Sequence, residues 1–120
     1  MDNSIFLSPL NSRFIEKREV AGFGEFYVRP TGGLVAERVQ GLVARHEEKE
    51  IGFAEFNAEY KKLLLTSCVC DESGNRVFET DEQYAAFNEN TPAFIVNAVA
   101  KHCNDVSKGD ADEVGKAEKN

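Results

Sequence analysis

The sequence predicts a small α+β domain that is mostly α-helical, with an N-terminal β-hairpin followed by about four helices. Residues rich in Phe, Val, Ile and Tyr flank a glycine-containing turn near the N-terminus, which is typical of a hairpin. Apolar residues then recur at helical spacing in several segments. We expect one domain at 13–106, because the segment 107–120 is charged and poor in large apolar groups, as in a disordered acidic tail.

The hairpin is expected at 13–29, after a flexible N-terminus at 1–12. The segment reads RFIEKREVAGFGEFYVR. Its two apolar runs flank residues 21–24, where glycines favour a tight turn. We therefore predict two antiparallel strands joined by this turn.

The four helices are expected at about 33–47, 51–69, 80–89 and 91–106. Gly41 weakens the first helix by about 1 kcal/mol relative to alanine. The third helix begins with TDEQ at 80–83. This is the pattern of a capping box, in which the Thr80 and Gln83 side chains each accept a hydrogen bond from the other residue's backbone N–H. Pro92 suits the start of the fourth helix, because its missing N–H costs nothing there.

Composition excludes several classes of protein. With 120 residues the chain has the size of one domain, and its longest apolar runs fall far short of the roughly 20 residues of a membrane span. A net charge of −7 argues against nucleic acid as a partner. The N-terminus has neither a basic region nor a long apolar stretch, so no signal peptide is expected. The three cysteines are then expected to be free thiols in a reducing compartment.

The acidic segment CDESGNRVFETDE at 70–82 is a candidate calcium-binding loop. Oxygen-bearing side chains fall at five ligand positions of an EF-hand loop, namely Asp71, Ser73, Asn75, Glu79 and Glu82. However, Arg76 occupies the position that requires glycine, and no second loop is present to pair with it. A turn at 71–75 that leads into a capped helix explains more residues. No metal is therefore expected.

Cysteine and histidine do not form a convincing reactive or zinc site either. Cys68 and Cys70 are separated by a single residue, which is too close for the usual zinc-ligand pairs, although Cys103 and His102 lie further along the chain. His46 sits in a charged run, whereas His102 falls on the apolar stripe of the last helix. No nucleophile motif, phosphate-binding loop or dinucleotide fingerprint is present. We expect a protein that is not an enzyme, has no cofactor and binds another protein.

The order of features resembles the tail assembly chaperones of long-tailed, siphovirus-type bacteriophages. In that family a V-x-D-x-x-G-x-x-x-F segment precedes a short helix and a final helix that ends near A-x-x-x-N. The matching residues here are Val69, Asp71, Gly74, Phe78, Ala100 and Asn104. The resemblance covers roughly residues 14–106.

The resemblance implies a non-enzymatic, late-expressed assembly factor in the host bacterial cytoplasm. Such a chaperone binds the tape measure protein, keeps it soluble and helps the major tail protein to polymerise around it, and it is absent from the mature virion. A longer, frameshifted product often accompanies it. Gly115 and Lys116 would fit a slippery GGG-AAA run in the gene.

A binding groove for the amphipathic helices of such a partner would be apolar. Two helical stripes supply candidate partner-binding residues, namely Phe53, Phe56, Tyr60, Leu64, Phe94, Ile95 and Val99. An ordinary core is the commoner explanation of such stripes, and self-association through the same face is also open. Two other functions remain as alternatives: a structural head–tail connector or tail terminator component, and a cellular adaptor or chaperone.

Overall fold

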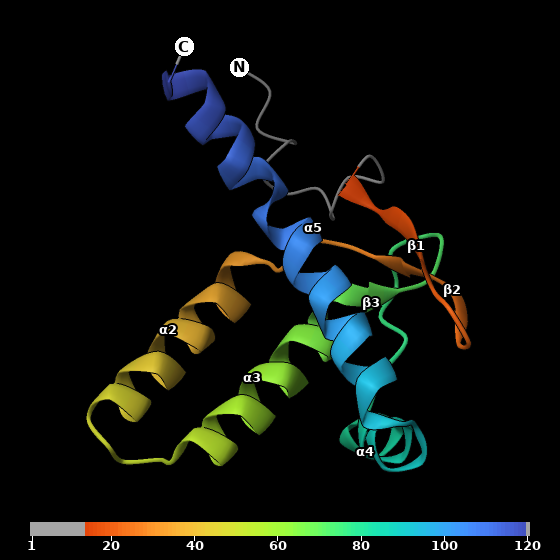
Figure 1. Ribbon diagram of the computed structural model, residues 1–120, viewed down its shortest axis with the longest axis horizontal. Coiled ribbons are helices and arrows are strands. Elements are labelled where there is room, and N and C mark those ends of the chain that lie inside the picture. Colours follow the sequence, from red (N-terminus) through yellow and green to blue (C-terminus); the bar gives the residue numbers. More distant parts are fainter. Residues whose placement is uncertain (1–13, 120) are drawn as a thin grey trace.

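The computed structural model describes residues 14–119, with side chains described up to Lys108. A three-stranded antiparallel sheet lies against an assembly of four helices (Figure 1). The elements in chain order are β1 (Glu16–Val20), β2 (Gly24–Val28), α2 (Gly33–Glu47), α3 (Phe53–Cys68), β3 (Val69–Cys70), α4 (Asp81–Asn90) and α5 (Ala93–Lys119). The predicted fold class, α+β and mostly helical with an N-terminal hairpin, is confirmed.

The hairpin forms where the sequence predicts it. β1 and β2 pair with Glu16 opposite Val28 and Val20 opposite Gly24. Gly22 and Gly24 have φ angles of 84° and 130° at the turn, a region that residues with a β-carbon rarely adopt.

The third strand was not predicted. β3 follows α3 directly and pairs with β2, so that Val69 lies opposite Val28 and Cys70 opposite Tyr27. A strand of two residues is too short to show an alternating pattern in the sequence, and its first residue, Val69, falls at the end of the helix expected at 51–69.

The main core lies between the sheet, α3 and α5. Its buried apolar cluster comes from these elements and from the segment that leads into α4. The side chains with almost no exposed surface are Leu65, Val28, Cys68 and Cys103. Figure 1 shows α5 crossing the molecule beside α3 and the sheet. A hydrogen bond of 3.1 Å from the backbone N–H of Thr31 to Ser107 Oγ joins the segment before α2 to α5.

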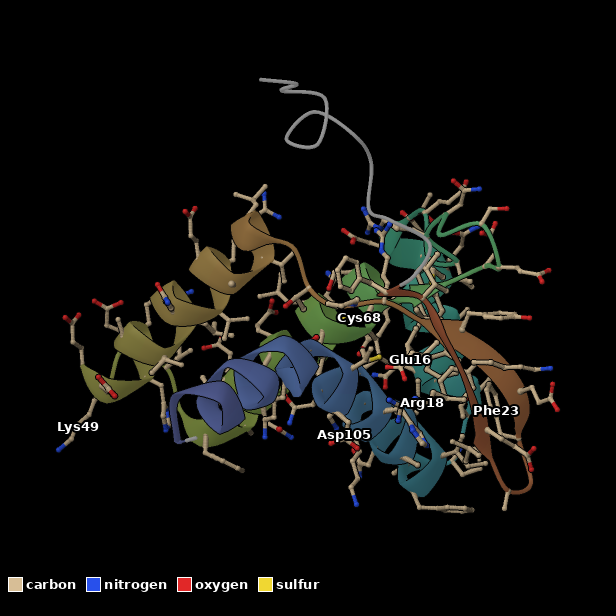
Figure 2. All side chains as sticks on the ribbon, turned by 90° about the horizontal axis from the view of Figure 1, so that it is seen from above. Glu16, Arg18, Phe23, Lys49, Cys68 and Asp105 are labelled. Carbon is tan, nitrogen blue, oxygen red and sulfur yellow. The ribbon has the colours of Figure 1, made fainter. Side chains whose placement is uncertain are left out.

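α2 and α3 form a pair of helices that extends away from the sheet (Figure 1). The turn between them contains Lys49, whose φ is 64°, and Figure 2 places Lys49 at the end of the pair farthest from the sheet. Leu42 and Ile51 are buried in this part of the molecule, but neither belongs to the main core cluster. α2 therefore depends mainly on α3 for its packing.

The capping box at the start of α4 is confirmed. The backbone N–H of Gln83 donates to Thr80 Oγ1 at 3.2 Å, and the backbone N–H of Thr80 donates to Gln83 Oε1 at 3.0 Å. Tyr84 then points into the core from the first turns of the helix.

The last helix is longer than expected. α5 continues as a helix to Lys119 instead of ending near residue 106. Ser107 belongs to the packed part of the helix, since its hydroxyl donates to the carbonyl of Cys103 at 2.9 Å. A helix that is already packed can extend into a charged segment, because adding a residue to an existing helix avoids the cost of nucleation. The predicted flexible N-terminus at 1–12 lies outside the described residues.

Candidate partner-binding surface

The structure does not bring the seven predicted partner-binding residues into one groove. Leu64, Ile95 and Val99 are core side chains, with exposed fractions of 2–6%. Leu64 and Ile95 are therefore core residues, because their part of the apolar stripe faces the sheet and the neighbouring helix, whereas Val99 also lines the apolar hollow described below. Phe53 and Phe94 are instead 70% and 71% exposed.

Phe56 and Tyr60 are half-buried and connect three helices. The Phe56 ring stacks on His46 of α2 with a centroid separation of 4.9 Å and on Tyr60 with a separation of 6.0 Å. The Tyr60 hydroxyl donates to Asn104 Oδ1 of α5 at 3.4 Å. These rings hold the α2–α3 pair and α5 together, which is a structural role.

A different apolar surface is open to solvent. It is a hollow of about 360 Å³ between the hairpin, β3 and α4, and we call it the aromatic hollow. Its main apolar lining residues are Phe23, Phe26, Val77, Phe78 and Phe87. Phe23 and Val77 are 45% and 47% exposed, which is unusual for large apolar side chains that lie in the same concavity.

Edge-to-face ring contacts fix the shape of the aromatic hollow. Phe23 lies at the hairpin tip (Figure 2), with its ring centroid 6.2 Å from Phe26 and 6.1 Å from Phe87. Phe87 in turn lies 5.2 Å from Phe78, which packs edge-to-face on Tyr84. The capping box sets where α4 begins, and so it also places Phe87 in this hollow.

Charged side chains near the aromatic hollow are paired. Glu25 lines the hollow, and its Oε2 forms an ion pair with Lys17 Nζ of the neighbouring strand at 2.7 Å. That hydrogen bond and the carboxylate charge raise the pKa of Lys17. Of the seven predicted partner-binding residues, Val99 alone lines this surface. Its other residues were not predicted, although Phe23 stands between two glycines in a turn, where a large apolar side chain is not expected to be needed for folding.

The segment that resembles a calcium loop is a turn organised by Asp71. Asp71 Oδ1 accepts hydrogen bonds from the backbone N–H groups of Ser73 and Asn75, each at 2.9 Å, and Gly74 has a φ of 90°. These bonds, first of all the one from Asn75, lower the pKa of Asp71. The Asp71 carboxylate thus accepts hydrogen bonds from its own loop. The Arg76 side chain bonds outside the loop, since its Nε donates to the carbonyl of Thr66 at 2.9 Å.

The three thiols are buried, and the possible zinc ligands do not converge. The Cys103 thiol is hydrogen-bonded to Cys68, and this bond together with burial raises the pKa of Cys103. Burial likewise raises the pKa of Cys70. The His102 ring turns away from the thiols, because its Nδ1 lies 3.2 Å from Arg18 Nη1 and the ring packs on Phe26. Within residues 14–108, no three His, Cys, Asp or Glu side chains are placed to hold a metal ion.

His46 also has a structural place. One of its ring nitrogens lies 3.3 Å from the carbonyl of Ile51, and its ring stacks on Phe56. Both histidines are therefore engaged with neighbouring groups.

No family model, curated protein or solved structure matches the chain. In the described part of the chain, no helix is both long enough and apolar enough to span a membrane.

Proposed function

We propose that this protein is a non-enzymatic chaperone of phage tail assembly, which uses the aromatic hollow to bind an apolar segment of another protein. The observation that carries the proposal is the solvent-open position of Phe23 and Val77 in one apolar concavity. Large apolar side chains that gather in a concavity of this kind are typical of surfaces that bind protein segments. The resemblance in the segment from Val69 to Asn104 supports the choice of a tail assembly chaperone.

The partner in this proposal is the tape measure protein, whose long amphipathic helices need protection before assembly. One apolar face of such a helix would insert side chains between the hairpin tip and α4, as in other helix-in-groove complexes. While bound, the helix could not aggregate through that face. The complex would then recruit the major tail protein in the host bacterial cytoplasm, and the chaperone would not remain in the mature virion.

Co-expression with the tape measure protein tests this function. With the wild-type chaperone, the tape measure protein is expected to stay in the soluble fraction and to co-purify. Phe23→Ser should lower the affinity of the complex about five- to tenfold, because one half-exposed Phe contributes about 1–1.5 kcal/mol when it becomes fully buried.

Phe94→Ser is the matched control, because Phe94 is even more exposed and belongs to α5 outside the aromatic hollow. It should leave the yield of the complex unchanged. The proposal fails if the tape measure protein stays insoluble with the wild-type chaperone. An equal loss with both variants would instead locate the binding surface elsewhere. Mass spectrometry of purified virions should not detect the protein; its presence in stoichiometric amounts would indicate a structural tail component.

A further inference from the structure

A second hollow lies at the start of α2, and three arginines surround it. This hollow of about 330 Å³ is lined by Arg29, Arg38 and Arg76 together with residues of α2 and α3, and we call it the arginine hollow. Its lining contains no Asp or Glu. Such a concentration of positive charge stands out in a chain whose net charge is −7.

Two of the guanidinium groups are held in place by backbone carbonyls. Arg29 donates from Nε to the carbonyl of Ser67 at 3.0 Å and from Nη1 to the carbonyl of Gly74 at 2.6 Å. Arg76 donates from Nε to the carbonyl of Thr66 at 2.9 Å. A carbonyl positions a guanidinium without neutralising its charge, and the remaining N–H groups stay available to an anion.

Among the described side chains, the arginines of the hollow form no ion pair. Arg18 pairs with Glu16 and Arg45 pairs with Glu50, whereas no ion pair within residues 14–108 involves an arginine of the hollow. Asp71 and Glu79 border a neighbouring concavity beside two of these arginines, but neither lies within ion-pair distance of them.

The N-terminus of α2 adds to the positive field. Gly32 is the N-cap residue, lines the hollow and provides no side chain to accept the first backbone N–H groups of the helix. The first turn of α2 also contains no acidic residue. Uncapped N–H groups and the helix dipole both favour an anion at this end.

Apolar side chains also line the hollow and decide which anion fits. Pro30, Val35 and Leu63 line it together with Gly32 and the polar residues Thr66 and Ser67. A free inorganic ion would leave these side chains uncovered, whereas an acidic peptide that also carries apolar side chains would contact both parts. We propose that the arginine hollow binds an acidic segment of a partner protein, in which carboxylates alternate with apolar side chains. This site is separate from the aromatic hollow and does not depend on the function proposed above.

Fluorescence anisotropy with short labelled peptides tests this site on the full-length protein. The peptide ELDLE should bind saturably and at least about tenfold more tightly than its neutral analogue QLNLQ, because the analogue cannot form charge-assisted hydrogen bonds. The acidic peptide EGDGE should bind about threefold or more weakly than ELDLE, because it leaves the apolar side uncovered. Raising the salt concentration from about 50 to about 300 mM should weaken ELDLE several-fold.

Two variants of α2 assign the binding to the hollow. Arg38→Gln removes an exposed arginine of the hollow, and Arg45→Gln removes an exposed arginine of the same helix outside it. We expect Arg38→Gln to weaken ELDLE at least about fivefold and Arg45→Gln to change its affinity less than about twofold. Both proteins should keep the wild-type circular dichroism spectrum, since neither side chain belongs to the core.

Four outcomes would overturn the proposal. Binding of QLNLQ as tight as that of ELDLE would show that the carboxylates are not recognised. An equal weakening of ELDLE by the two variants would indicate a general charge effect. Inorganic phosphate that displaces ELDLE at the same concentration as unlabelled peptide would indicate a simple oxyanion site. A wild-type dimer that Arg38→Gln dissociates in analytical ultracentrifugation would make a second copy of this chain the occupant.

Discussion

The carboxylate of Asp71 organises the turn between β3 and α4. Besides the two backbone N–H groups that donate to Oδ1, Asn75 Nδ2 lies 3.3 Å from Oδ2, and the backbone N–H of Asp71 donates to the carbonyl of Asn75 at 2.8 Å. Gly74 closes the turn with a positive φ, and a β-carbon there would lie 3.0 Å from Ile15 Cδ1. The Asp71 oxygens, which occupy a ligand position of a cation loop in the sequence, are therefore hydrogen-bond acceptors within the turn.

The lowered pKa of Asp71 makes the stability of this turn depend on pH. The folded pKa lies below the ordinary value of 3.8, so the stabilisation is fully present above about pH 4 and is lost as the pH falls through the folded pKa. Urea unfolding at pH 6 should show Asp71→Asn to be less stable than the wild type. That difference should shrink as the pH is lowered towards 2.

Glu72→Gln serves as the control for this pH dependence. Glu72 is the exposed neighbour of Asp71, and its side chain accepts none of the hydrogen bonds of the turn. Its effect on stability should stay small across the same pH range. A gap between the wild type and Asp71→Asn that does not change with pH would show that the carboxylate charge does not hold the turn.

At the scale of single elements, α4 and α2 begin in opposite ways. α4 has a capping box and two acidic residues, Asp81 and Glu82, in its first turn, so its N-terminus is satisfied from within the chain. α2 begins at Gly32 without a side-chain cap. The two helices thus leave very different electrostatic fields at their N-termini, and only that of α2 is open to a ligand.

Thr80→Ala should destabilise the protein by about 1 kcal/mol, because it removes the acceptor for the backbone N–H of Gln83. Thr80→Ser keeps the hydroxyl and should lose less than half of that amount. Chemical denaturation measures both values. Equal losses in the two variants would mean that the methyl group of Thr80, and not the cap, stabilises the start of α4.

At the scale of the whole molecule, local patterns predicted the elements but not their arrangement. The hairpin, the start of α4 and the spacing of the helices depend on neighbouring residues, so the sequence was sufficient for them. β3 and the division of apolar stripes between core and surface depend on contacts between distant segments. Leu64 and Phe53 lie on the same predicted stripe, yet one is buried and the other is exposed, because only part of α3 is covered by α5 and the sheet.

The two hollows illustrate the same limit. Phe23 and Phe87 are far apart in the sequence, and Arg76 is far from Arg29 and Arg38, so no motif joins the members of either set. The sheet and the α3–β3 junction bring them together. The sequence nevertheless contained one useful local signal for each hollow, namely a phenylalanine in a glycine turn and an uncapped helix start between Pro30 and Val35.

The uneven packing of the molecule predicts uneven stability. α3, α5 and the sheet share the main core, whereas α2 packs mainly on α3 through a small separate set that includes Leu42. Elements with few buried contacts open more readily than the rest of a protein. In native-state hydrogen exchange, the amides of α2 should therefore exchange faster than those of α3 and α5.

Leu42→Ala and Leu65→Ala distinguish this local opening from global unfolding. Leu42→Ala should cost about 2–3 kcal/mol and accelerate exchange in α2 far more than in the sheet, because it removes the main buried contact of that helix. Leu65→Ala, in the fully buried main core, should accelerate exchange in all elements. If Leu42→Ala accelerates every element equally, α2 unfolds together with the core. The arginine hollow, which α2 helps to form, would then be as rigid as the sheet, whereas separate opening would make peptide binding there stabilise α2.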